Sequence, residues 1–266
     1  MTRYVGAVAC LLCTLATSGA WADEDLAEEL ANPFATLSSV KLQLNYDHAV
    51  GPRQAGERYY LNIQALVPFR LNDEWSLITR TDFVEFDQDK IFPGSGHQLG
   101  LSDAVQSFFL SPANQTSSGL VWGAGVIVLY PLATQRRLGS EKWGAGPTVG
   151  AVIQRSNWTA GILANHIWSF AGNEQRSDIS STFVQPFVSY KSGPWTLSLN
   201  EQSTYDWQKR QWTVPVNATV SRLIRVGSQP LSIFAGLRYW AQSPTAAAHH
   251  WGATAGITLL FPKSKP

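Results

Sequence analysis

The stretch VKLQLNYD, residues 40–47, alternates strictly between apolar and polar side chains. Successive side chains of a β-strand point to opposite faces, so this segment predicts a strand with one apolar and one polar face. The alternation recurs along the chain as far as Phe261. Two architectures fit it: a transmembrane β-barrel with a lipid-facing side and a wet lumen, and a soluble antiparallel sandwich.

The positions of the tryptophans favour the barrel. The chain has 11 tryptophans, and apart from Trp21 they lie mostly where a predicted strand begins or ends. Two belts of indoles at opposite strand ends are typical of a bilayer with two interfaces. The first belt is Trp75, Trp122, Trp158 and Trp195, and the second, beside longer connections, is Trp143, Trp168, Trp207, Trp212, Trp240 and Trp251. We therefore predict an all-β fold, a transmembrane antiparallel up-and-down barrel in the outer membrane.

About twelve segments have the length and pattern of membrane-crossing strands. Twelve is an even number, as expected of a bacterial single-chain barrel with short periplasmic turns and longer outer loops. Prolines at 68, 147, 186 and 215 fall inside these segments, where we expect β-bulges. The segments are 38–46, 58–71, 75–86, 100–110, 119–129, 144–155, 158–169, 180–190, 195–205, 211–223, 229–240 and 251–261.

The two ends of the chain have different compositions from the barrel region 38–261. Residues 1–22 read as a signal peptide, with Arg3, an apolar run and the cleavage motif Ala20-Trp21-Ala22. Residues 23–37 are acidic and then apolar at helical spacing, and we expect a short N-terminal periplasmic arm or plug. A solvated arm is the simpler alternative. Residues 262–266 form a C-terminal tail.

Charge and cysteine content exclude several classes of function. Both cysteines, Cys10 and Cys13, lie in the predicted leader, so we expect neither disulfides nor thiol catalysis in the mature chain. Removal of the leader leaves equal numbers of basic and acidic residues, and no basic surface predicts nucleic-acid binding. His249 and His250 have no carboxylate or thiol nearby in sequence, and we expect no metal and no cofactor.

The last predicted strand carries an assembly pattern. Thr254, Gly256, Leu259 and Phe261 resemble the signal found on the last strands of outer-membrane barrels. We therefore expect the barrel-assembly machinery as a partner, together with outer-membrane lipid and a small-molecule solute.

The parity of the strands predicts which side chains face the lumen. Arg80 and Asp82 are two apart and share a face, and a lone charge facing lipid costs about 2–4 kcal/mol. They could form a selectivity pair, or a structural salt-bridge network that holds the barrel rigid. The predicted pore-lining residues are Lys41, Gln43, Asn45, Asn62, Gln64, Arg80, Asp82, Asn217, Thr219 and Arg238.

His166 and Ser169 invite comparison with barrel hydrolases that pair a serine with a histidine. Residues three apart on a strand face opposite sides, so we predict no catalysis there and place His166 in the outer aromatic belt. A membrane-embedded hydrolase would need an outward serine and histidine on neighbouring strands at the outer rim. We expect no enzyme.

Several segments together resemble one family of bacterial outer-membrane proteins. They are residues 30–33 (LANP), 139–147 (GSEKWGAGP), 165–169 (NHIWS), 203–207 (STYDW) and 211–215 (QWTVP). The chain resembles barrels related to the meta-pathway phenol-degradation proteins, whose members are sometimes labelled neuromedin U. The resemblance implies an outer-membrane channel or transporter for a small solute, and the family name suggests a small hydrophobic or aromatic compound. The alternative is a non-conducting structural or surface-binding barrel.

Overall fold

We describe a computed structural model of the protein. The described residues are Leu26, Glu29, Leu30, Asn32, Phe34 and residues 37–91, 94–114, 116 and 118–262. The predicted signal peptide and the last four residues of the predicted tail lie outside them. Within the described part of the chain, no helix is long and apolar enough to cross a membrane.

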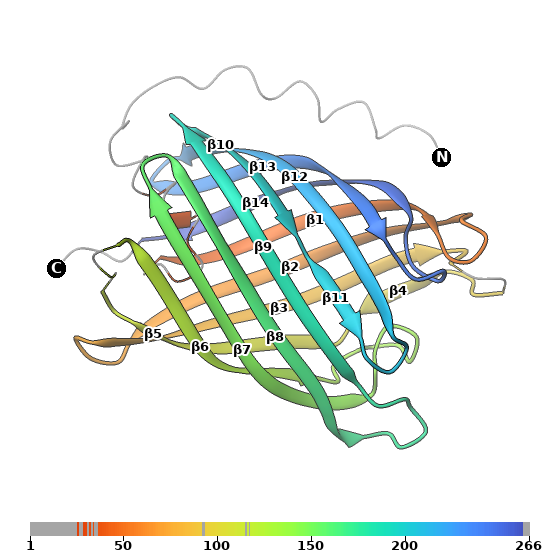
Figure 1. Ribbon diagram of the computed structural model, residues 1–266. Coiled ribbons are helices and arrows are strands. Elements are labelled where there is room, and N and C mark those ends of the chain that lie inside the picture. The colour runs from red at the N-terminus through yellow and green to blue at the C-terminus, as the bar shows by residue number, and fades with distance from the viewer. Residues whose placement is uncertain are drawn as a thin grey trace.

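The strands wrap into one closed antiparallel barrel (Figure 1). β1 pairs with β2 on one side and with β14 on the other, which closes the wall. The wall has twelve positions, so the predicted fold class is confirmed. The strands are β1 (Ser38–Val50), β2 (Gly56–Arg70), β3 (Trp75–Asp89), β4 (Gln98–Leu101), β5 (Ala104–Pro112), β6 (Leu120–Tyr130), β7 (Lys142–Arg155), β8 (Trp158–Gly172), β9 (Ser180–Ser192), β10 (Trp195–Glu201), β11 (Ser203–Asp206), β12 (Gln211–Val226), β13 (Gln229–Gln242) and β14 (His250–Phe261).

Two positions in the wall hold two short strands in place of one long strand. β4 and β5 both pair with β3, and the chain between them turns aside at Ser102 and Asp103. β10 and β11 both pair with β9 and β12, and the interruption between them is Gln202. The register is the same on both sides of Gln202, so side chains keep their faces across the gap.

The four strand prolines cause fewer bulges than expected. Of the four prolines, Pro215 alone lies at a register shift, between β12 and β13. The expectation of bulges at Pro68, Pro147 and Pro186 is wrong. Each proline lies where the pairing on one side is missing, so its absent N–H breaks no ladder bond. Pro68 lies beyond the last residue of β2 that pairs with β1, and Pro147 lies in a gap of the β7–β8 pairing. Pro186 on β9 and Pro215 on β12 lie on the two sides of the interruption at Gln202.

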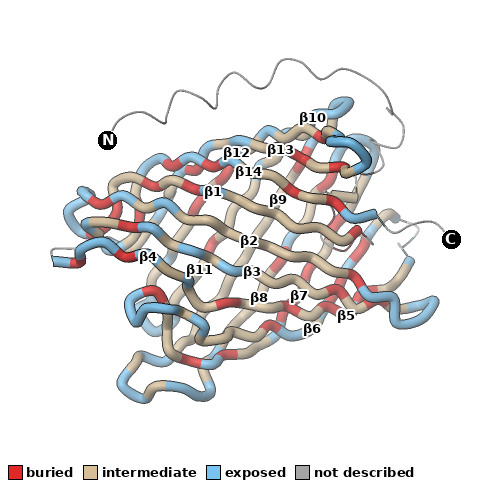
Figure 2. Tube along the Cα trace, turned by 180° about the vertical axis from the view of Figure 1, so that it is seen from behind, coloured by how far each residue is buried: buried red, intermediate tan, exposed pale blue. Residues whose placement is uncertain are grey.

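The connections differ in length at the two ends of the barrel. The turns 71–74, 156–157, 193–194 and 227–228 are tight, whereas the connections 90–97, 131–141, 173–179 and 243–249 are longer. The exceptions are the longer connection 113–119 at the first end and the short turn 207–210 at the second. Short periplasmic turns and long outer loops are the rule in such barrels. The arm, which precedes β1, therefore lies at the periplasmic end. Figure 2 shows exposed residues concentrated at the two ends of the barrel.

The two faces of the wall differ in chemistry. Leu44, Leu197 and Leu237 point outward and are 54%, 58% and 56% exposed. Their neighbours Asn45 and Arg238 point inward and are almost fully buried. An apolar outer face exposed to this extent would be costly in water and is the expected surface against lipid.

Aromatic side chains surround both ends of the outer face. Trp122 and Trp158 are exposed at the periplasmic end, and Trp168 and Trp251 at the outer end. One member of the predicted outer belt is misplaced: Trp240 points into the lumen, where its Nε1 donates a hydrogen bond to Asp47 Oδ1 at 3.1 Å. The reason is parity, because Trp240 is two residues from the inward Arg238 and must share its face.

Candidate transport path

All ten residues predicted to line the pore lie on the lumen side of the wall. Lys41, Gln43, Gln64, Arg80, Asn217 and Thr219 line a lumenal cavity. Asn45, Asp82 and Arg238 hydrogen-bond to members of this set, and Asn62 is the register partner of Gln43. Whether a solute passes them stays a prediction.

The upper part of the lumen, towards the long loops, holds a charged cluster around the buried Asp47. Arg58 Nη2 lies 2.7 Å from Asp47 Oδ2, and Arg238 Nη1 lies 3.7 Å from its Oδ1. Arg238 also donates to Asn217 Oδ1 at 2.7 Å and to the hydroxyl of Tyr60. One carboxylate thus serves two guanidinium groups, and the bonds connect strands β1, β2, β12 and β13.

Aromatic rings flank these cations inside the barrel. The Arg58 guanidinium lies 5.2 Å from the Tyr60 ring centroid, 5.7 Å from that of Phe86 and 5.9 Å from that of Trp240. Such contacts stabilise a cation and leave flat apolar surfaces in the path.

The middle of the lumen is crossed by Arg80. Its Nε lies 2.9 Å from Asp82 Oδ2, and its Nη1 donates to Gln185 Oε1 at 3.5 Å. Four wall positions separate β3 from β9 on one side and six on the other, so this hydrogen bond connects nearly opposite walls. Gln64 completes the group by donating to Asp82 Oδ1 at 2.7 Å. Arg80 and Asp82 are thus part of a salt-bridge and hydrogen-bond network, and the side chain of Arg80 also narrows the lumen.

Below Arg80 the lumen contains a cavity of about 270 Å³. Its wall includes hydroxyl and amide side chains of β9, β10 and β12, among them Ser189, Asn200 and Asn217. Its floor includes Leu30, Asn32 and Leu37 of the arm. The arm therefore closes the periplasmic side of a polar cavity.

Phe34 is the main apolar group that the arm inserts into the barrel. It is buried in a cluster with inward side chains of five strands, and its ring packs edge-on against Phe109 with centroids 5.4 Å apart. Asn32 Nδ2 donates to Gln154 Oε1 at 3.2 Å, which fixes the arm to β7. The other buried members of the cluster are Ile78, Phe109, Val121, Val152 and Leu163.

Two glycines form the seat of the Phe34 ring. Gly123 on β6 and Gly150 on β7 are direct register partners. A Cβ atom at either position would lie 2.6 or 2.7 Å from a carbon of the Phe34 ring. A side chain at either position would therefore push the ring away, so the wall is recessed where the arm binds.

A second apolar contact secures the arm nearer the rim. Leu37 packs with Leu223 and Leu260, and Leu26 and Leu30 lie against this cluster. Leu26 and Leu30 have helical backbone, so the spacing seen in the sequence does place both leucines on one side. The described part of the arm is thus held by the barrel.

Sequence reasoning missed several lumenal groups. Asp47, Arg58, Tyr60 and Gln185 have the right parity but lie at strand ends or on a strand for which no interior set was predicted. Phe34 gave no signal beyond its position in an apolar arm, because its seat is made of glycines that are remote in sequence.

The outer face carries one contact relevant to the hydrolase alternative. His166 does not pair with Ser169, whose Oγ donates to Asp178. On the neighbouring strand, Ser180 Oγ lies 3.3 Å from His166 Nε2, and Thr182 Oγ1 lies 2.7 Å from its Nδ1. A catalytic histidine needs a group at Nδ1 that stabilises its charged form, and a threonine hydroxyl that also accepts Trp207 Nε1–H does this poorly. His166 stacks on Trp168 with centroids 4.1 Å apart, as a member of the aromatic belt.

The described residues offer no group of three or more side chains suited to bind a metal ion. His249 Nδ1 contacts Ser243, and His250 Nε2 contacts Gln54, so the adjacent histidines have separate hydroxyl and amide partners.

Comparisons with known proteins identify the fold. No family model matches the sequence, and a comparison with curated proteins gives no match. The barrel is similar to an outer membrane channel from Pseudomonas putida F1, with 13% sequence identity, a TM-score of 0.65, and 85% of this chain and 96% of that chain covered. Outer membrane phospholipase A from Escherichia coli aligns with 9% identity and a TM-score of 0.49, over 87% and 93% of the two chains. The architecture is that of an outer-membrane barrel, in agreement with the predicted location.

Proposed function

We propose that the protein is an outer-membrane channel for a small solute. The observation that carries this proposal is the polar lumen, which contains a cavity of about 270 Å³ beneath the side chain of Arg80. A barrel that served only as a scaffold could fill this space with packed side chains. Selectivity in such pores comes from the charges and hydrogen-bonding groups along the path.

The charges of the lumen favour an anion. The polar layer contains four cations, Lys41, Arg58, Arg80 and Arg238, and two carboxylates, Asp47 and Asp82, while Glu29 of the arm adds a third carboxylate to the cavity lining. The whole chain is almost neutral, so the excess of positive charge belongs to the lumen and not to the composition. An excess of fixed cations raises the local concentration of anions in a narrow path.

The solute proposed is a small aromatic anion. Tyr60, Phe86 and Trp240 present ring surfaces beside the cations of the upper lumen. The resemblance of the sequence to barrels related to the meta-pathway phenol-degradation proteins suggests the same class of compound. Rings and cations together suit a molecule with one flat apolar part and one negative group.

The arm would have to move for this solute to pass. Phe34 and the leucines of the arm close the periplasmic end through apolar contacts, and Asn32 adds a hydrogen bond to Gln154. The structure thus corresponds to a closed form of the proposed channel.

Single-channel conductance in a planar bilayer tests the proposal. The wild-type barrel should conduct. In a salt gradient, Arg80→Ala should move the reversal potential away from the equilibrium potential of the anion. Arg70→Ala is the matched control, because Arg70 lies at the periplasmic rim in an exposed pair with Asp73. A correctly folded barrel that conducts in neither the wild-type form nor the Phe34→Ala form would favour the structural alternative.

A further inference from the structure

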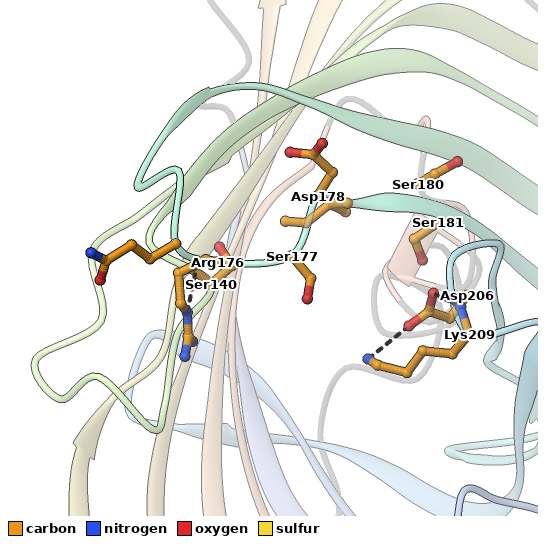
Figure 3. Close-up of a pocket in the computed structure, with 10 residues that line it drawn as sticks. Ser140, Arg176, Ser177, Asp178, Ser180, Ser181, Asp206 and Lys209 are labelled. Carbon is orange, nitrogen blue, oxygen red and sulfur yellow. Dashed lines mark hydrogen bonds and ion pairs between the residues drawn. The ribbon is translucent and has the colours of Figure 1, made fainter.

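A second cavity lies at the outer mouth of the barrel. It measures about 390 Å³ and lies between the β8–β9 loop and the β11–β12 turn (Figure 3). Ser181 and Asp206, which line it, are register partners and share the inner face of the wall with Gln185 and Gln202. The cavity therefore borders the lumen and is separate from the cavity beneath Arg80.

Arg176 supplies an unneutralised positive charge to this cavity. Its Nε donates to the carbonyl oxygen of Ser140 at 3.3 Å, and its Nη2 donates to those of Arg136 and Gly139. Among the described residues, no carboxylate lies within ion-pair distance of Arg176, and its Nη1 has no partner. The carbonyl groups fix the guanidinium in place while leaving its charge and one donor group available.

The other charged side chains that line the cavity are paired, and Ser140 of the lining also donates to the carboxylate of Asp103. Lys209 Nζ lies 2.9 Å from Asp206 Oδ2, and Lys142 Nζ lies 2.9 Å from Asp178 Oδ1. Figure 3 shows the Arg176 and Lys209 side chains on opposite sides of the cavity, with Asp178 directed away from both. Of the charged side chains that line the cavity, Arg176 is thus the one without an oppositely charged partner among the described residues, and a single cation matches a monoanion better than a dianion such as a phosphate monoester.

Hydroxyl groups complete the lining. Ser140 and Ser180 are engaged with Asp103 and His166. Ser177 and Ser181 have no side-chain hydrogen bond to any described residue and can donate to a ligand. Figure 3 shows Arg176 and Ser181 on opposite sides of the cavity, so the guanidinium and the hydroxyl groups can bind different parts of one small acid.

We propose that this cavity binds the carboxylate group of a small organic acid at the outer mouth. Arg176 provides the charge, and Ser177 and Ser181 provide further donors. The role of the site in loading the lumen rests on the proposed channel function, whereas binding itself does not. The volume lies within the range of small-molecule sites.

Binding of benzoate and benzamide to the detergent-solubilised barrel, measured by titration calorimetry, tests this site. The two probes have similar shape, and only benzoate is charged. Benzoate should bind more tightly than benzamide, and Arg176→Gln should weaken benzoate by about tenfold or more while leaving benzamide unchanged. Lys90→Gln, on an exposed loop away from the cavity, is the control and should bind benzoate like the wild type.

A second pair of variants guards against misfolding of the loop that Arg176 holds. Lys209→Gln leaves Asp206 unpaired and should weaken benzoate, whereas Lys209→Gln combined with Asp206→Asn restores the charge balance and should recover binding. Equal affinity for both probes, or unchanged benzoate affinity in Arg176→Gln and Lys209→Gln, would overturn the site. Conductance distinguishes the two proposals: a barrel that binds benzoate without conducting retains the site and loses the channel, and one that conducts without binding benzoate does the reverse.

Discussion

The two ends of the lumen are built in different ways. At the periplasmic end, the seal is an apolar ring, Phe34, which comes from outside the wall and rests on two glycines. In the upper lumen, the side chains that fill the space belong to the wall itself and are joined by ion pairs around Asp47. The arm can leave its seat without breaking a strand pairing, whereas the ion pairs around Asp47 cannot be broken without leaving buried charges unpaired.

Asp47→Asn should have the largest effect on stability. It removes the carboxylate that pairs with both Arg58 and Arg238, and breaking a buried ion pair from one side costs about 3–5 kcal/mol. Urea unfolding in lipid vesicles measures the loss. Asp73→Asn, in the exposed pair with Arg70, is the control and should change the free energy of unfolding by less than about 0.5 kcal/mol. Equal unfolding midpoints for the two variants would refute the structural role of the Asp47 cluster.

Phe34→Ala should open the periplasmic closure with a smaller loss of stability. Removing a buried phenylalanine from a rigid core costs about 3–5 kcal/mol, and here the freed arm recovers chain entropy, so the loss should be below that range. Conductance should rise, and the arm should become sensitive to protease.

Gly150→Val checks the same closure from the wall. The new side chain would occupy the position of the Phe34 ring, so it should give the same open phenotype without altering the arm. Phe69→Ala, on the exposed outer face, should alter neither property. Normal protease resistance of the arm in Gly150→Val would contradict the proposed seat.

Arg80→Gln sharpens the comparison in the middle of the lumen. The side chain of Arg80 is 17% exposed, so its loss should destabilise the barrel less than Asp47→Asn. The ratio of anion to cation permeability should fall a few-fold, because the layer loses one cation and Asp82 loses its partner. Reversal potentials in a potassium chloride gradient give the ratio. An unchanged ratio would show that Arg80 has a structural role alone.

The smallest effect concerns the outer loop 173–179 and depends on pH. Hydrogen bonding to Lys142 holds the pKa of Asp178 below its usual range. Because the folded pKa is depressed, this contact stabilises the loop above the usual carboxyl pKa of about 4 and is lost as pH falls through the lower folded value. Hydrogen exchange in the loop, corrected for its intrinsic pH dependence, should be constant from neutral pH to about pH 5 and rise below about pH 4. Lys142→Met should abolish this rise, and a rise that persists in the variant would assign it to another group.

The sequence was sufficient for the barrel and for most of the lumen. Alternation with period two needs no knowledge of tertiary contacts, so it predicted the fold and the faces of residues such as Arg80 and Asn217. The same rule applied to the end of β13 would have placed Trp240 beside Arg238, but its position near a long connection suggested the aromatic belt. Parity was informative there, and residue type was misleading.

Other features depend on contacts between segments far apart in the chain. The Asp47–Arg58 pair requires the register of the first hairpin, because Asp47 lies opposite Arg58 only when the strands extend into the loop. The interruption at Gln202 reflects Pro186 and Pro215 on its two neighbours, and nothing near Gln202 in sequence predicts it. The seat of Phe34 needs Gly123 and Gly150 to meet in register, which no local pattern shows.

The arm has a mechanical consequence for the shape of the barrel. Phe34 is four residues before Ser38, where β1 begins, and four residues of extended chain reach at most about 14 Å. Its seat lies on β6 and β7, across the barrel from β1. A short segment of limited reach therefore connects two facing walls of the barrel and limits how far they can separate. While Phe34 is seated, the arm therefore sets an upper limit on the width of the barrel cross-section.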